Sequence, residues 1–276
     1  SRIYSNKADP ADVDGTAQLT FEADGFDLDT TDPNYNGSGR TYVAWQWKTQ
    51  GAAGSSNTDG SINTTTTSVN QAAGFSINIY TGTKSNATVG HGLGAVPKMI
   101  LIKDTTNTES WIVYHEAVGN DGNLYLNLTS AKVTQAAFQN TTPTSSVFSI
   151  GTTDGLNKAS AVHVAYCFAE VEGFSSFGGY TGNGSTDGTF VSTGFKPAFV
   201  LLKRTNATQE WQMYDTQRDP FNVANHKLEA NSSGAESILT GDNNLDFLSD
   251  GFKLRQANGG MNASGSTYIY MAFAEN

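Results

Sequence analysis

Three short segments of this 276-residue chain contain residue types that could do chemistry. The first, at 90–94, reads Gly-His-Gly-Leu-Gly and has the look of a phosphate or oxyanion loop. Such loops bind anions where they lead into a helix, but no helical pattern follows here, and the corresponding segment 192–196 has no histidine. We therefore interpret 90–94 as a tight turn that uses the conformational freedom of glycine.

The second segment is the acidic stretch 242–250, Asp-Asn-Asn-Leu-Asp-Phe-Leu-Ser-Asp. Carboxylate and amide oxygens are the ligands that calcium prefers, but an EF-hand loop fails here because Phe247 and Lys253 replace its required Gly and Glu. A looser surface calcium site remains the one cofactor hypothesis. The alternative is that Asp246 and Asp250 flank a turn while Phe247 and Leu248 pack inward.

The third segment holds Asp215, Arg218 and Asp219. An Arg between two carboxylates more often locks a loop than catalyses a reaction. His115 and His163 do not recur at the equivalent positions of the repeat described next, so neither is a shared requirement of the unit. We predict no catalytic, cofactor-binding or metal-binding residues and no enzymatic activity; the ligand-binding residues, if any, are unknown.

The elements that carry these residues repeat along the chain. His-Val-Ala-Tyr-Cys-Phe-Ala-Glu at 163–170 returns as Tyr-Ile-Tyr-Met-Ala-Phe-Ala-Glu at 268–275, and a looser copy stands at 42–47. Trp111 and Trp211 occupy equivalent positions 100 residues apart. Self-similarity at a long, fixed period is the signature of tandem modules.

The repeat predicts four segments. Residues 73–172 and 173–276 each form a complete module, and residues 1–49 match only the C-terminal part of a preceding one. Between them, residues 50–72 are rich in Gly, Ser, Thr and Asn, and we predict a linker or a long exposed loop.

Many short segments rich in β-branched and aromatic residues, bounded by Gly, Asn and Asp, predict strands. The continuous apolar run 99–102 is typical of a strand covered on both faces. We expect the three closing segments to be buried, central strands, and only 130–138 and 229–239 are weak helical candidates. The predicted fold is all-β, with tandem, jelly-roll-like β-sandwich modules.

Composition excludes some partners. A net charge of −10 without any basic run argues against nucleic acid, and no apolar run is long enough for membrane insertion. Cys167, the single cysteine, is predicted to be a small buried hydrophobe. Trp111 and Trp211 are expected in the core, and Trp45 and Trp47 share one face of a predicted strand; the sequence leaves open which of these aromatic stripes, if either, forms an exposed platform.

Several segments together resemble a known family. Residues 74–115 carry Gly-Phe-Ser…Tyr-Thr-Gly, His-Gly-Leu-Gly…Pro-Lys-Met-Ile…Lys and Trp…Tyr-His. The pattern continues at 166–175, 180–185, 194–199 and 246–255. It resembles virion structural proteins of tailed bacteriophages, frequent in marine and cyanobacterial phages, which carry tandem modules in long fibre-like or appendage proteins. The resemblance covers the chain from about Leu19.

The resemblance implies a structural protein of the virion, in a fibre, tail appendage or surface projection with a host-attachment role. The implied partners are other virion proteins, further copies of the chain in a homo-oligomer, for which we expect a trimer, and a host cell-surface glycan or receptor. Two alternatives stay open: a capsid decoration protein and a carbohydrate-binding β-sandwich module. A polysaccharide depolymerase would need paired carboxylates at a cleft, and the modules share no such pair.

Overall fold

The computed structural model describes residues 2–275 except 14–18, 23, 29–31, 51–53 and 242–243. The described residues form twenty β-strands in five sheets, with one four-residue helix, α1 (Asp154–Asn157), and one 3-10 turn, η1 (Glu116–Val118). The predicted all-β fold is thereby confirmed. Neither helical segment has the length or the apolar character that crossing a membrane requires.

Residues 54–170, which we call the central module, contain a large antiparallel sheet of seven strands and a two-stranded sheet, β5 (Ala87–Gly90) with β10 (Val147–Ile150). The large sheet has the order β3 (Thr66–Asn70), β4 (Phe75–Thr81), β11 (Val162–Ala169), β6 (Pro97–Asp104), β7 (Ile112–His115), β8 (Gly122–Tyr125), β9 (Val133–Thr134).

Residues 171–275, the C-terminal module, follow the same plan. A six-stranded sheet has the order β12 (Ser175–Thr181), β20 (Thr267–Ala274), β14 (Pro197–Arg204), β15 (Gln212–Asp215), β16 (His226–Glu229), β17 (Ser237–Ile238). A smaller sheet joins β13 (Phe190–Ser192), β19 (Gly251–Leu254) and β18 (Leu245–Leu248). Strand for strand, the six-stranded order equals β4-β11-β6-β7-β8-β9 of the central module.

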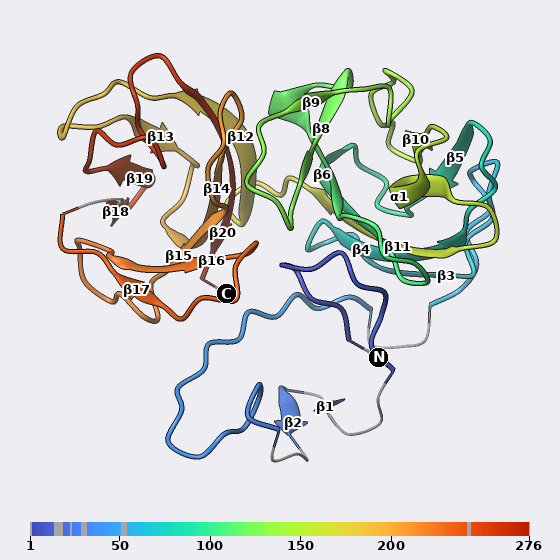
Figure 1. The fold of residues 1–276 in the computed structure, drawn as a ribbon, viewed down its shortest axis with the longest axis horizontal. Coiled ribbons are helices and arrows are strands. Elements are labelled where there is room, and N and C mark those ends of the chain that lie inside the picture. Colours follow the sequence, from blue (N-terminus) through green and yellow to red (C-terminus); the bar gives the residue numbers. More distant parts are fainter. Residues whose placement is uncertain are drawn as a thin grey trace.

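Each large sheet is covered on both faces. One face packs on the module's own small sheet, and the opposite faces of the two large sheets share a third cluster, which we call the inter-module core. Figure 1 accordingly shows the modules side by side, with β5 and β10 on one outer side and β13, β18 and β19 on the other. The inter-module core contains Phe75, Met99, Trp111, Val113, Leu124, Leu126 and Phe168 from the central module and Phe177, Phe199, Leu201, Trp211, Ile269, Met271 and Phe273 from the C-terminal module.

This arrangement explains the continuous apolar run of β6. Ile100 and Ile102 face the central module's own core, whereas Met99 faces the inter-module core, because successive side chains of a strand point to opposite faces. The predicted double covering of 99–102 is therefore confirmed. The closing strands β11 and β20 are central in their sheets, each flanked by two long neighbours, as predicted.

The third predicted closing strand, in residues 41–48, is wrong. The chain there is extended but forms no strand, and it passes across the faces of the two large sheets, where no backbone groups are free to pair. Its side chains are used instead: the Trp47 ring centroid lies 6.2 Å from that of Phe168 and 5.5 Å from that of Phe273. Trp45 packs on Phe199 at 5.3 Å, so neither tryptophan forms an exposed platform.

The linker predicted for residues 50–72 is also wrong over its described part. Residues 66–70 form β3, the edge strand that pairs with β4, and Ile62 is buried in the central module's core. Gly54 and Gly60 lie so close to the backbone that an added Cβ would approach Thr67 O and Thr88 O within 2.3 and 2.5 Å. Threonine suits a strand, and small residues allow this close packing, so polar composition did not mean a loose loop.

In the N-terminal segment, β1 (Leu19–Phe21) pairs with β2 (Phe26–Leu28) in the same way as β18 pairs with β19. The two hairpins also share the sequence pattern Leu-x-Phe-x-x-Asp-Gly-Phe-x-Leu. Their environments differ: Phe247 in β18 is 4% exposed, whereas Phe21 in β1 is 78% exposed.

Phe273 tests the inter-module core, because its ring contacts Phe168, Phe174, Phe177 and Trp47. We expect Phe273→Ala to lower the free energy of unfolding by about 3–5 kcal/mol, measured by denaturant titration. The matched control is Phe221→Ala, at a side chain 84% exposed, which should change it by less than about 0.5 kcal/mol. Equal effects of the two substitutions would contradict a packed contact between the modules.

Candidate functional site

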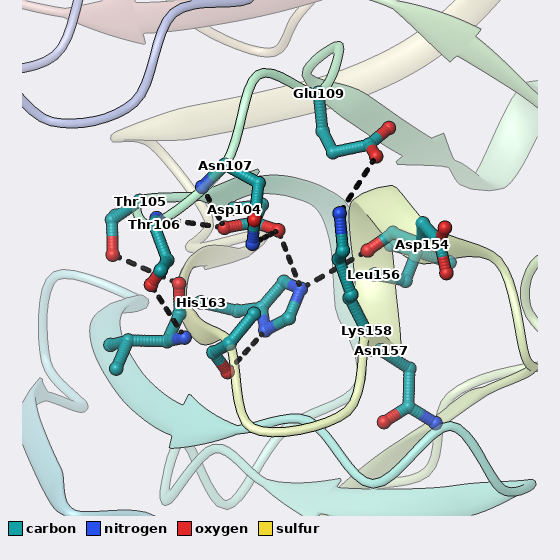
Figure 2. A network of polar contacts seen from close by, with 12 residues as sticks. Asp104, Thr105, Thr106, Asn107, Glu109, Asp154, Leu156, Asn157, Lys158 and His163 are labelled. Carbon is teal, nitrogen blue, oxygen red and sulfur yellow. Dashed lines mark hydrogen bonds and ion pairs between the residues drawn. The ribbon is translucent and has the colours of Figure 1, made fainter.

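A buried polar cluster lies where the turn after β6 meets α1 and β11 (Figure 2). Asp104 Oδ1 accepts the backbone N–H groups of Thr106 at 2.7 Å and Asn107 at 2.9 Å. His163 Nε2 lies 3.8 Å from Asp104 Oδ2, and both side chains are fully buried. The His163 ring stacks on Tyr80, with 5.2 Å between the ring centroids. An Asp–His pair of this kind could orient a proton if a reacting group touched it.

The surroundings of His163 indicate a packing role instead. Its Nδ1 lies 3.1 Å from Ala161 O and its Nε2 lies 3.3 Å from Asp154 O, so both ring nitrogens face backbone carbonyls. Burial lowers the pKa of His163, which favours the neutral imidazole. The equivalent Tyr268 stacks on Tyr180 in the same way, at 5.0 Å, and cannot replace a histidine in acid–base chemistry near neutral pH. The cluster therefore joins β6, α1 and β11.

A buried asparagine fixes the neighbouring loop in both modules. Asn157 Oδ1 accepts the N–H of Thr83 at 2.7 Å, and Asn262 Oδ1 accepts the N–H of Asn183 at 3.0 Å. Both asparagine side chains are fully buried and also donate to backbone carbonyls. Backbone groups of the neighbouring loops satisfy these side chains, which is the normal state of buried polar groups.

The Gly-His-Gly-Leu-Gly segment has the geometry of a tight turn. Gly92 and Gly94 both have φ of +70°, a region that only glycine adopts readily. His91 is fully buried; its Nδ1 accepts the N–H of Leu93 at 3.2 Å and its Nε2 lies 3.2 Å from Thr144 O. The histidine holds two segments together.

The acidic stretch does not converge on a calcium site among the described residues. Asp242 and Asn243 lie outside them, Asp246 pairs with Arg255 at 3.1 Å, and Phe247 packs into the core. Asp246 sits within β18, so of the two aspartates we expected to flank the turn only Asp250 does. The described part of the chain has no group of three His, Cys, Asp or Glu placed to hold a metal.

Arg218 and its carboxylates lock a loop. Arg218 Nε donates to Asp215 Oδ2 at 2.7 Å, and Asp215 Oδ1 accepts the N–H of Arg218 at 2.9 Å. Asp219 Oδ2 accepts the N–H groups of Asn225 and His226 at 2.9 and 2.8 Å. The three side chains are engaged with the loop backbone, which is the arrangement that the sequence favoured.

Cys167 is fully buried, and burial raises the pKa of its thiol to about 12. A thiol of this kind stays protonated and is a poor nucleophile. The prediction of a small buried hydrophobe is confirmed.

A different set of polar contacts recurs between modules. Lys103, at the end of β6, is fully buried, and its Nζ donates to Ala8 O at 3.1 Å. Trp111, directly before β7, donates from Nε1 to Tyr4 O at 2.9 Å. The hairpin formed by β6 and β7 thus holds the backbone of the N-terminal segment.

The C-terminal module holds the central module in the same way. Lys203 Nζ donates to Thr129 O at 2.8 Å, and Trp211 Nε1 donates to Tyr125 O at 2.9 Å. In both modules the Lys and the Trp are eight residues apart, and their two acceptor carbonyls are four residues apart. We call this pair of side chains the Lys–Trp clamp.

Two backbone hydrogen bonds complete each junction. One runs from the β6–β7 or β14–β15 turn to the carbonyl that the Lys also contacts, and the other runs back from the captured segment to a threonine carbonyl. They are Glu109 N to Ala8 O at 2.9 Å and Ala11 N to Thr105 O at 2.9 Å at the first junction, and Gln209 N to Thr129 O and Lys132 N to Thr205 O, both at 2.8 Å, at the second. Each junction therefore contains four hydrogen bonds, and those of one are equivalent to those of the other.

The captured segments are hairpins of one kind. Arg2 pairs with Asp12, and Asn123 pairs with Val133, ten residues apart in each case. The weak helix predicted at 130–138 is wrong, because these residues form β9 and turns. Sequence reasoning also missed the first hairpin, although Ile-Tyr-Ser-Asn at 3–6 and Leu-Tyr-Leu-Asn at 124–127 carry a detectable signal.

The buried lysine of each clamp favours the docked state of the hairpin over the undocked state. Burial lowers the pKa of Lys103 and lowers that of Lys203 to about 8. A buried ammonium group is costly unless carbonyl oxygens replace its water, and one of the acceptors of each lysine belongs to the captured hairpin. An undocked hairpin would leave this donor short of a partner.

One further polar bond crosses between the modules. His115 is fully buried; its Nε2 donates to Tyr270 O at 3.1 Å, and its Nδ1 accepts the N–H of Ala117 at 3.2 Å. Both nitrogens are satisfied only in the neutral form, and burial lowers the pKa of His115 to about 4.

Comparison with known proteins gives one family. The whole chain, residues 1–276, matches a family model described as a domain of unknown function (DUF7483). No curated protein and no solved structure matches the chain.

The clamp predicts a local effect of removing one donor. Trp111→Phe keeps an aromatic ring in the inter-module core but removes the N–H that Tyr4 O accepts. We expect amide hydrogen exchange at Ala11 to become about tenfold faster, because hairpin 2–12 is held less firmly. Exchange measured by NMR checks this.

Trp211→Phe is the matched variant at the second junction. It should accelerate exchange at the Lys132 amide and leave the Ala11 amide unchanged, since Trp211 holds Tyr125 O. The same exchange pattern in both variants would show that the tryptophans act only through general stability.

His115 predicts a pH dependence of stability. Its folded pKa, about 4, is below the unfolded value of about 6.5, so the unfolded chain binds the proton first as the pH falls. The free energy of unfolding should therefore decrease between about pH 6.5 and pH 4, by at most about 3 kcal/mol from this residue. His115→Asn should reduce this slope in urea titrations, with the share of His91 and His163 remaining. An unchanged slope would contradict the assignment.

Proposed function

We propose, for a chain that belongs to the DUF7483 family, that it is a structural protein of a tailed-phage virion, in a fibre, tail appendage or surface projection. The observation that carries the structural role is the recurrence of one junction: two hairpins are captured by two Lys–Trp clamps through equivalent hydrogen bonds. Units joined by one repeated contact build an extended body. The phage assignment rests on the sequence resemblance of the segments between 74 and 255.

The inter-module core supports a structural role in which the two modules are held rigidly together. Phe168 and Phe273 meet across the modules, with 6.1 Å between their ring centroids, and Trp47 fills the space beside both. Small polar interfaces let domains move relative to one another, whereas a large apolar interface restrains them. A rigid pair of modules suits a projection that must transmit force along its length.

The partners that we propose follow from the same resemblance. They are other virion proteins and further copies of the chain, with a trimer as the expected assembly, and a host cell-surface glycan or receptor for the exposed loops. Trp111 and Trp211 are buried, so a glycan would need other contacts.

Antibody labelling of purified phage particles, viewed by electron microscopy, tests the proposal. We expect label on a tail or on a surface projection, because the proposed chain is an exposed part of the particle. Pre-immune serum on the same particles is the control. Label scattered over the capsid would make the chain a decoration protein, and intact particles without label would overturn the virion assignment.

A further inference from the structure

The C-terminal module contains a third hairpin of the captured kind. Lys227 in β16 pairs with Ser237 in β17, ten residues apart, as Arg2 pairs with Asp12 and Asn123 with Val133. The helix predicted for 229–239 is wrong for the same reason as that for 130–138. All three copies carry asparagine at the same position, residues 6, 127 and 231.

This third hairpin is already shaped for capture. Asn231 Oδ1 accepts the N–H of Trp211 at 2.8 Å, as Asn127 Oδ1 accepts the N–H of Trp111 at 3.0 Å. The side of the hairpin that a clamp would hold is open, however: residues 233–238 are exposed, whereas Ala8 and Thr129, whose carbonyls accept from the clamp lysines, are half-buried. The β16–β17 hairpin therefore has the same conformation as the two captured hairpins, but no module in the described part of the chain covers it.

We propose that the β16–β17 hairpin is a docking site for a further module of the same family, bound through a Lys–Trp clamp. By equivalence, Ser233 O would accept from the lysine, Glu229 O would accept from the indole N–H, and the Glu236 N–H would donate to a threonine carbonyl. The partner is thus a β-hairpin with Lys and Trp eight residues apart, placed as Lys203 and Trp211 are.

The charges on this edge are already compensated. Glu229 pairs with Lys227 at 2.5 Å and Glu236 pairs with Arg218 at 2.9 Å, so both carboxylates already have cationic partners. Glu229 O accepts the N–H of Ser232 at 3.2 Å, as Tyr125 O, which Trp211 also contacts, accepts that of Leu128 at 3.4 Å. The second captured hairpin has Tyr125 and Lys132 at the positions of Glu229 and Glu236. The clamp bonds only to the main chain at these positions, so the different side chains do not prevent docking.

A second copy of this chain has no unoccupied clamp among its described residues with which to bind the β16–β17 hairpin, whereas an additional module fused to the chain would have one. The two Lys–Trp pairs of this chain, Lys103 with Trp111 and Lys203 with Trp211, each hold a hairpin already. A second copy could bind only after its own 2–12 hairpin is displaced. The inference concerns the junction itself and does not depend on where the chain acts.

The test extends the intact chain by one module. Residues 1–275 are followed by a second copy of residues 171–275, because Phe-Ala-Glu at 273–275 matches the Phe-Ala-Glu at 168–170 that leads into the C-terminal module. We expect the amide of Glu236 to exchange at least about tenfold more slowly in the extended chain than in the intact chain. Hydrogen exchange by NMR or mass spectrometry measures it.

Matched variants assign the effect to the clamp. Trp211→Phe in the added copy should abolish most of the slowing of exchange at the original Glu236. Trp111→Phe in the same extended chain should leave that slowing unchanged. Glu236→Pro, which lacks the N–H, should loosen the added module, and Glu236→Gln, which keeps it, should not. An added module that stays unfolded, or that folds without slowing exchange at Glu236, would overturn the proposal.

Discussion

The structure depends on the need to cover both faces of two large sheets. A sheet with one solvated face alternates apolar and polar residues, whereas β6, β11, β14 and β20 are apolar on both faces and must lie between two cores. Each module supplies one cover itself, through its small sheet. The second cover is the neighbouring module, with Trp45 and Trp47 of the N-terminal segment filling the same layer. Neither module's large sheet is therefore complete without its neighbour, and the two are parts of one packed body.

Apolar packing alone does not fix how one module sits on the next, because burial of apolar surface is non-directional. The polar contacts fix the relative position of the modules. Lys103 and Lys203 reach backbone carbonyls at fixed places, and His115 reaches Tyr270 O, so a shift of the interface would leave buried donors unpaired. Buried charges often add little net stability while they restrict the arrangements that are tolerated. We interpret the clamp in that sense, as the group that selects one junction geometry.

Much of the fold could be predicted from the sequence, because the features in question depend on which side chains stand at which positions. The all-β class, the central position of the strands that contain Cys167 and Met271, and the tight turn at His91 follow from apolar runs, β-branched residues and glycine. The strand at 66–70 was missed because an edge strand of Thr, Ser and Asn has the composition of a loop. The strand predicted at 41–48 failed because apolar patterning predicts burial but not backbone pairing. The captured hairpins were missed because their contacts use carbonyl and amide groups, which leave only Tyr and Asn as a trace in the sequence.

The junction has a direction, which decides what kind of assembly it can make. The clamp lies on the β6–β7 or β14–β15 turn, and the acceptor hairpin lies on β8–β9 or β16–β17, so the surfaces joined by the polar contacts are different, although the inter-module core joins equivalent faces of the two large sheets. Contacts between unlike surfaces give open, head-to-tail arrays unless the rotation between units closes a ring, whereas a two-fold dimer needs one surface that matches itself. The length of such an array is set by the number of modules along the chain. A trimer, as expected for a fibre, would need another surface, and the lateral and axial contacts of the assembly would then be independent.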